Sequence, residues 1–336
     1  MSFFVFRTQG STGARELADA LGGSRLRRFE GGRFFRTRNT PNPVTVRPGD
    51  VIVNWGGGAI QVPQGVKTLN NTAINSKFTD AQKLKAAGVA TVEVSKTRPN
   101  VQAAPAVAAV DPAIALHGQF IDQLEDLVEA PMQRNAVYQR GLGEVQTKLQ
   151  QLIAALNTPV PVARAAAARA DESWVGRVND HIGGTDLLTP PPAPDYFVKK
   201  VNIVEEYRLH MFQGKSIRAG VKKLREGFAT APTGNQQRAS AWVRSYDGGW
   251  RIVYDGFESK KAMRELAAKA VETLGLEFGA VDLGKLADGS YIVLEVNRAP
   301  GLEGGTVNSY ASAITAFANG NFGQRAEGQQ RRRRAA

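Results

Sequence analysis

The chain has 336 residues, of which 42% are hydrophobic and 22% are charged. These proportions are ordinary for a globular protein, and the length predicts two or three packed units of roughly 100–150 residues each. The absence of cysteine excludes a disulfide framework, a thiolate nucleophile and a cysteine-based zinc or iron–sulfur site. The sequence contains neither an apolar run of about 18 residues nor an N-terminal secretion signal, so we expect a cytoplasmic protein without a membrane span.

The net charge of +12 is partly a property of the C-terminal tail, residues 326–336. Four of the twelve charges belong to Arg331 to Arg334, which leaves +8 for the rest of the chain. Such an excess attracts nucleotides, acidic substrates, RNA and DNA alike. The tail is therefore interpreted either as a solvated, disordered end or as a contact for nucleic acid or an acidic partner.

The N-terminal region alternates strand and helix signals. In chain order these are a strand over 3–7, a helix from the turn 10–13 to about Leu21, a strand over 51–55, a helix from Asn71 or Thr72 to about Ala87, and a strand over 89–94. Apolar runs rich in β-branched residues and followed by glycine are typical of buried parallel strands. We expect residues 1–97 to form a small open α/β domain.

Residues 98–170 differ in composition from their surroundings. Two segments rich in alanine and proline flank a long helical pattern from about Ala113 to Asn157, with apolar residues at helical spacing. This arrangement predicts an inserted helical arm that packs against the protein or binds a partner, and that carries no catalytic chemistry.

From residue 171 the chain is dominated by strand signals, with two helices near the end. The predicted strands lie near 174–178, 196–201, 206–212, 216–221, 240–245, 251–254, 277–283 and 290–297, and the helices at about 259–274 and 309–317. We expect a mixed α and β fold for this part of the chain.

The strongest chemical signal is a predicted hairpin near the C-terminus. Asp288-Gly289 indicates a two-residue loop, and counting from it places Asp282 opposite Glu295, with Cβ atoms about 4.5–5.5 Å apart. Strand alternation puts Glu295 and Asn297 on the same face as Tyr291 and Val293. Two opposed carboxylates repel unless a proton or cation lies between them, and these hard oxygen donors suit Mg²⁺. The alternative is a solvated hairpin face with scattered charges.

A second strand-like segment also has one polar face. Glu206, Arg208 and His210 alternate with Tyr207, Leu209 and Met211, which is also typical of an exposed strand with ion pairs. The chain has only three histidines, and none has the spacing of a His-based metal site.

Cationic side chains near glycines add candidate phosphate-binding groups. They are Arg177 ahead of Gly183-Gly184, Lys222-Lys223, and Arg244-Ser245 ahead of Gly248-Gly249. Each of them is also compatible with an ordinary solvated surface.

Taken in order, these segments resemble the ATP-grasp superfamily, particularly carboxylate–amine ligases such as the ribosomal-protein glutamate ligases, and more distantly D-alanine–D-alanine ligases. Asp282, Glu295, Asn297 and Gly301 are similar to the family's C-terminal metal and phosphate motif. The segment 206–208 resembles its acidic-x-Arg strand. The NWGGG segment, residues 54–58, and the Asn-rich stretch after it resemble the pre-ATP-grasp domain. The Asn-Trp-Gly start looks like ATP-grasp proteins of tailed bacteriophages, and a phage origin would imply the host cytoplasm.

Three departures from the family pattern concern cationic and amide groups. Arg177 stands where many members have lysine, no asparagine follows Arg244-Ser245, and Ala280 stands where D-alanine ligases have an arginine. These departures affect the substrate and the charge stabilisation of the reaction more than nucleotide binding.

The resemblance implies an ATP-grasp fold with an N-terminal open α/β pre-ATP-grasp domain and an inserted helical arm. Two α+β subdomains would enclose the nucleotide: a nucleotide-binding subdomain over 171–213 and a C-terminal subdomain with the metal site over 214–325. It implies ATP and Mg²⁺, with Mn²⁺ as an alternative ion, and formation of an amide or peptide bond from carboxylate and amine substrates through an acyl phosphate. The implied metal ligands are Asp282, Glu295 and Asn297; the implied catalytic cations are Arg244 and Arg177; and the implied nucleotide contacts are Arg177, His181, Gly183, Gly184, Lys199, Lys200, Val201, Glu206, Arg208 and Lys222.

Two other functions remain open at this point. One is a nucleic-acid or virion-associated binding protein on a non-catalytic ATP-grasp scaffold, and the other is a phosphotransferase that leaves a stable phosphorylated product. The sequence does not indicate the oligomeric state.

Overall fold

The computed structural model describes residues 1–7, 12–30, 32–36, 42–98, 174–179, 191, 193–233, 235–240, 242–302 and 305–323. The expected helical arm at 113–157, the glycine loop at 181–186 and the tail at 326–336 lie outside these ranges. No helix within them is long and apolar enough to cross a membrane.

The N-terminal region contains a four-stranded parallel sheet with the order β2-β1-β5-β6. Its strands are β1 (Phe3–Phe6), β2 (Ser24–Leu26), β5 (Val51–Asn54) and β6 (Lys67–Leu69), and α1 (Thr12–Ala20) joins the first two. A small hairpin, β3 (Arg28–Glu30) with β4 (Arg33–Phe35), is inserted before β5. All four residues of β5 are buried, which explains the uninterrupted apolar run in the sequence.

The segment after β6 differs from its prediction. Helix α2 (Lys77–Ala86) begins after Ser76, whose hydroxyl accepts a hydrogen bond from Thr79 N at 3.1 Å. The predicted start at Asn71 or Thr72 is wrong, because the Asn71 amide pairs with the backbone of Ile60 at 2.8 and 2.9 Å instead of capping a helix. The predicted strand over 89–94 is reduced to β7 (Val94–Ser95).

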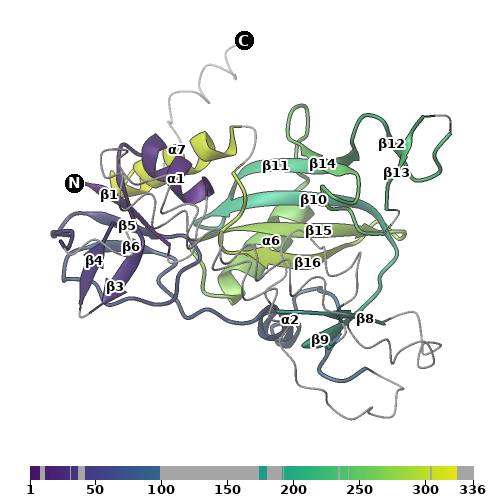
Figure 1. The fold of residues 1–336 in the computed structure, drawn as a ribbon, viewed down its shortest axis with the longest axis horizontal. Coiled ribbons are helices and arrows are strands. Elements are labelled where there is room, and N and C mark those ends of the chain that lie inside the picture. The colour runs from purple at the N-terminus through teal and green to yellow at the C-terminus, as the bar shows by residue number, and fades with distance from the viewer. Residues whose placement is uncertain are drawn as a thin grey trace, which may run out of the picture.

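The C-terminal region contains a five-stranded antiparallel sheet with the order β14-β11-β10-β15-β16. Its strands are β10 (Ile203–Phe212), β11 (Lys215–Leu224), β14 (Trp250–Val253), β15 (Phe278–Leu286) and β16 (Tyr291–Asn297). Helix α6 (Lys261–Thr273) covers one face of this sheet (Figure 1). A smaller sheet of β7, β9 (Tyr196–Lys199) and β8 (Trp174–Arg177) lies with α2 beyond β16.

The strand predicted over 240–245 is wrong. This segment belongs to the loop that joins β13 (Gln237–Arg238) to β14. Strand β13 pairs with another short strand, β12 (Phe228–Ala229). Two serine side chains accept backbone hydrogen bonds within the loop, from Val243 N to Ser240 Oγ at 2.8 Å and from Gly248 N to Ser245 Oγ at 3.0 Å. Such local bonds replace those of a β-ladder.

The two main sheets are joined through buried groups. The Asn70 side chain accepts from Glu277 N and Phe278 N and donates to Phe278 O, at 2.8, 3.1 and 2.8 Å. Trp55 stacks on Phe278 with a centroid separation of 5.1 Å, and Tyr310 of α7 (Thr306–Ala318) packs edge-on against both rings. Helix α7 also packs against α1, so the N-terminal sheet is fixed to the end of β15 (Figure 1).

Candidate active site

The face of the five-stranded sheet opposite α6 lines a cavity of about 550 Å³. Helix α2, the small sheet and the loop after β13 supply its other walls. A volume of this size falls within the usual range for small-molecule and cofactor sites, about 300–1,000 Å³.

The predicted pairing of Asp282 with Glu295 is confirmed, but through two deviations that compensate each other. The hairpin loop has three residues, since Leu286 N bonds Ser290 O at 2.9 Å and Gly289 has a φ of +84°. A β-bulge then restores the register, because Leu283 pairs with Val293 and leaves Leu294 as the extra residue.

The bulge also changes which side chains share a face. Val293 and Val296 both belong to the core beneath α6, whereas Glu295 and Asn297 both line the cavity. The predicted grouping of Val293 with Glu295 is therefore wrong. Without the bulge, strict alternation would send Val293 and Glu295 to the same side.

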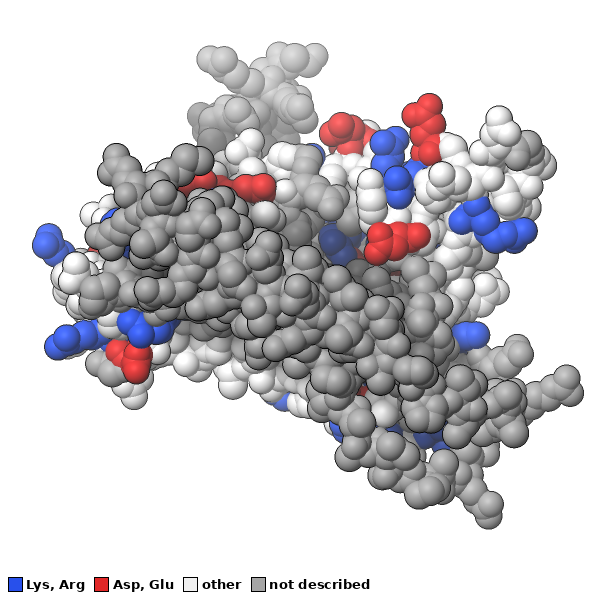
Figure 2. All heavy atoms as spheres, viewed as in Figure 1, with Lys and Arg blue, Asp and Glu red and all other residues white. Residues whose placement is uncertain are grey.

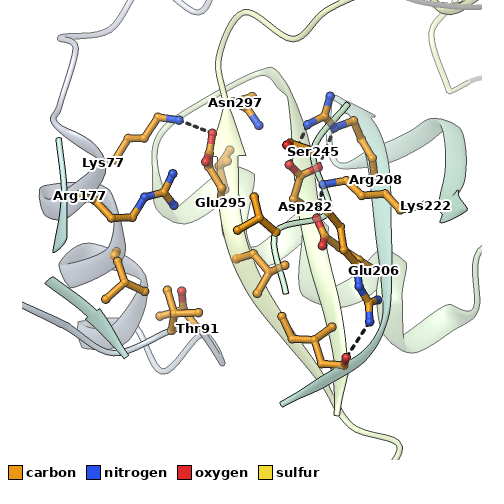
Figure 3. Close-up of a pocket in the computed structure, with 18 of the residues that line it drawn as sticks. Lys77, Thr91, Arg177, Glu206, Arg208, Lys222, Ser245, Asp282, Glu295 and Asn297 are labelled. Carbon is orange, nitrogen blue, oxygen red and sulfur yellow. Dashed lines mark hydrogen bonds and ion pairs between the residues drawn. The ribbon is translucent and has the colours of Figure 1, made fainter. Parts of the chain in front are cut away.

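Asp282 is paired with Arg208 from the neighbouring strand. The guanidinium donates from Nε to Oδ1 at 2.6 Å and from Nη2 to Oδ2 at 2.7 Å (Figure 3). Burial alone would raise the pKa of Asp282, but the charge of Arg208 outweighs it and holds this pKa below its ordinary value. The carboxylate is thus ionised and fixed in orientation.

Glu206 and Glu295 also have cationic partners in the cavity. Lys222 of β11 pairs with Glu206, and Lys77 at the start of α2 pairs with Glu295 (Figure 3). Burial raises the pKa of Glu206, and the ammonium of Lys222 acts in the opposite direction. Sequence reasoning missed Lys77, because its partner is 218 residues away.

Other predicted residues lie around the same cavity. Arg177 projects from β8, and Val201 and Lys200 follow β9, with Lys200 Nζ 4.9 Å from the centroid of Trp242. Lys199 also lines the cavity and forms an exposed ion pair with Glu93 at 3.5 Å. His181, Gly183 and Gly184 lie outside the described residues.

Arg244 lies over the start of β10. Its Nη2 donates to the carbonyl oxygens of Ile203 and Val204 at 2.8 and 3.2 Å, and its guanidinium carbon lies 4.9 Å from the centroid of Trp250. In this arrangement the loop after β13 covers the part of the cavity next to residues 199–201.

His210 lies on the same face of β10 as Glu206 and Arg208, but it does not line the cavity. It is fully buried, with Nδ1 3.2 Å from Tyr310 Oη and Nε2 3.0 Å from Tyr254 Oη. Burial and the charge of Arg208 lower its pKa to about 3. His210 is therefore neutral near pH 7 and connects β10 to α7.

The described residues that line the cavity carry more positive than negative charge. Nine are lysine or arginine and four are aspartate or glutamate, an excess of five positive charges. On the face shown in Figure 2, by contrast, basic side chains lie in separate groups with acidic side chains among them. The concentration of charge in the cavity favours a ligand with several negative charges.

The donors in this cavity fit a hard divalent cation. Asp282 and Glu295 are directly opposed, and Asn297 lies on the same strand as Glu295. Within the described residues, no group of three or more His, Asp or Glu side chains could hold a metal. A metal here would depend on two carboxylates, one amide and oxygens from a bound ligand, which is the coordination typical of Mg²⁺ with a nucleotide.

The chain has the ATP-grasp fold. It can be superposed on the ATP-grasp ligase PsnB, solved with a phosphomimetic variant of a minimal precursor, Mg and ADP, with a TM-score of 0.50 and 12% identity over 95% of this chain and 99% of that one. Two further similar structures are D-cycloserine synthetase DcsG, at a TM-score of 0.43 and 15% identity over 94% and 100% of the chains, and D-alanine–D-alanine ligase from Bacillus anthracis, at 0.47 and 10% over 96% of each. No family model and no curated protein matches the sequence.

Proposed function

We propose that this protein is an ATP-dependent ligase that joins a carboxylate to an amine through an acyl phosphate. The observation that carries the proposal is the convergence of Asp282, Glu295 and Asn297 on one wall of a strongly cationic cavity. The ATP-grasp fold, which also occurs in solved ligases, supports it.

In this proposal Asp282, Glu295 and Asn297 would hold Mg²⁺, which would supply positive charge against the phosphates of the nucleotide. The backbone of residues 199–201 receives the adenine, with Glu206 on the adjoining strand. Lys222, Arg177 and Lys77 supply positive charge to the phosphates. Positioning and charge stabilisation account for most of the catalysis of phosphoryl transfer, so these fixed cations matter more than a general base.

The ion pairs in the cavity suggest how it accepts a nucleotide. Lys77 and Lys222 neutralise Glu295 and Glu206 in the structure. When the phosphates arrive, the two ammonium groups turn to phosphate oxygens, and the carboxylates are released for metal and nucleotide. The protein thereby avoids leaving buried charges without partners in either state.

The bond changes are as follows. A carboxylate oxygen of the substrate attacks the γ-phosphorus and ADP leaves, which produces the acyl phosphate. The amine then attacks the acyl carbon, the bond from that carbon to the phosphate oxygen breaks, and the nitrogen loses a proton. Arg244 lines the cavity while its Nη2 donates to the carbonyls of Ile203 and Val204, and in this mechanism its guanidinium supplies positive charge to the acyl phosphate.

The test is Mg²⁺-dependent ADP formation with pools of amino acids, peptides and polyamines, with the condensed product identified by mass spectrometry. Heavy-oxygen label placed in the carboxylate should appear in the released phosphate. A stable phosphorylated product formed without an amine would instead identify a phosphotransferase. Absence of ADP formation with every pool would count against a ligase.

A further inference from the structure

The carboxyl end of β1 lies next to the cavity, because Arg7, which directly follows this strand, lines it. In the parallel sheet β2-β1-β5-β6, the chain first adds β2 on one side of β1 and then adds β5 and β6 on the other side. The boundary between β1 and β5 is therefore a topological switch point. In open α/β sheets, ligands bind outside the carboxyl ends of the strands at such a switch point. Arg7 directly follows β1, and Trp55 and Gly56 directly follow β5.

Arg7 extends from this switch point into the lining of the cavity. Its Nη1 donates to Trp55 O at 3.1 Å, which fixes the guanidinium across the ends of both strands. The fit around it is close. A Cβ atom at Gly56 would lie 2.9 Å from Arg7 Nη1 and 2.7 Å from the Cβ of Ala299.

These distances connect Arg7 to the candidate metal ligands. Both atoms lie within 3 Å of the position that a Cβ at Gly56 would take, so Arg7 Nη1 and Ala299 Cβ are within about 6 Å of each other. Ala299 is two residues beyond Asn297, and an extended chain covers roughly 7 Å in two residues. Arg7 thus lies on the order of 10 Å from the metal ligands, a separation that a small substrate can span.

The nucleotide cations proposed above come from other elements: Lys222 from β11, Arg177 from β8 and Lys77 from α2. Arg7 comes from the N-terminal sheet. Its planar fork of donors matches a carboxylate with two parallel hydrogen bonds. We infer that Arg7 binds a carboxylate of the acid or amine substrate and thereby selects substrates that carry one at this position. This inference rests on the proposed function, since it names the substrate class for the same cavity.

The test measures the rate at which phenylglyoxal modifies Arg7, by peptide mapping of the full chain. Exposed Arg33 on β4 is the internal control, because it lies outside the cavity lining. With Mg²⁺ and AMPPNP present, we expect succinate to slow modification of Arg7 several-fold, and neutral succinamide to leave it unchanged. Neither compound should change the rate at Arg33. The labelling needs no turnover, so the result does not depend on whether ligase activity is found.

Three results would overturn the inference. Full protection by Mg²⁺ and AMPPNP alone would make Arg7 a ligand of the nucleotide phosphates. Equal effects of succinate and succinamide would exclude recognition of charge. An Arg7 that phenylglyoxal never modifies would be closed to substrates.

Variants give a second, independent measurement. Arg7→Gln should weaken succinate binding to the AMPPNP-loaded protein roughly 10- to 100-fold, as expected for loss of charged hydrogen bonds, with unchanged AMPPNP affinity. Arg7→Lys should recover part of the loss. A purely structural role for Arg7 would instead lower the melting temperature of Arg7→Gln and weaken both ligands together.

Discussion

The two faces of the five-stranded sheet show how one set of strands supports two kinds of environment. Toward α6, the strands present Tyr207, Leu209 and Met211 to a closed apolar core. Toward the cavity, the alternate positions of the same strands carry the Glu206–Lys222 and Arg208–Asp282 pairs. The apolar face stabilises the fold, and the polar face lines the cavity with paired charges. Substitutions on the two faces should therefore affect different properties.

The largest expected effect is on the cavity face. Glu295→Gln removes a charge from the proposed metal site but retains the shape of the side chain. We expect ADP formation to fall about 100- to 1,000-fold, the range found when a charge-stabilising catalytic group is lost. Near-normal turnover by a variant with an unchanged melting temperature would refute the metal assignment.

The matched change on the other face should reduce stability and leave ligand affinity intact. Met263 of α6 is 1% exposed and packs in the core beneath the sheet. Met263→Ala should cost about 2–5 kcal/mol of unfolding free energy, measured by urea denaturation. The AMPPNP affinity of the folded variant should equal that of the wild type. A large loss of affinity would show that the two faces are coupled.

A third prediction concerns how the buried side chain of His210 makes the stability of the protein depend on pH. The pKa of His210 is lowered to about 3, whereas an unfolded histidine has its ordinary value of 6.5. As pH falls below 6.5, the unfolded chain takes up a proton that folded His210 does not, so stability is lost between pH 6.5 and about 3. At pH 5 the loss is about 2 kcal/mol.

The control for this pH effect is His210→Gln, which retains a polar side chain between Tyr254 and Tyr310 but has no titrating group. The difference in unfolding free energy between pH 7.5 and pH 5 should be smaller in this variant than in the wild type. Identical pH dependence in the two proteins would place the loss of stability at another residue.

The smallest effect is expected for the ion pair between Lys77 of α2 and Glu295 of β16. Lys77 and Glu295 have side-chain exposures of 28% and 22%, so solvent screens their attraction. Lys77→Met should change stability by less than about 1 kcal/mol. If Lys77 exchanges partners on nucleotide binding, AMPPNP affinity should fall about tenfold, as for one charged hydrogen bond. Unchanged affinity, measured by calorimetry, would argue against the exchange.

Sequence reasoning worked where the controlling pattern is local. Alternation along β10 identified the side chains that face α6, and the Asp288-Gly289 turn located the hairpin. The pairing of Asp282 with Glu295 was correct only because the longer loop and the bulge cancel. Neither feature has a signature in the sequence that distinguishes it from a regular two-residue hairpin.

The errors arose where polar side chains bind backbone groups and so replace the predicted helix or strand pairing. Asn71 did not begin a helix because its amide is engaged with Ile60, and residues 240–245 did not form a strand because serine side chains satisfy the backbone. Lys77 could not be assigned from the sequence, since nothing near it identifies Glu295 as its partner. Long-range polar contacts of this kind do not follow from periodicity.

The buried Asn70 connection has a consequence for how the protein exchanges its ligands. The Asn70 side-chain amide makes three hydrogen bonds to the start of β15, and the rings of Trp55, Phe278 and Tyr310 pack together beside it, so the N-terminal sheet and β15 are joined by buried contacts. A clamshell motion between these two parts would break all of these contacts at once. Under the proposed function, entry of nucleotide and release of product should therefore depend on the small β7-β9-β8 sheet and the loop after β13, which supply other walls of the cavity.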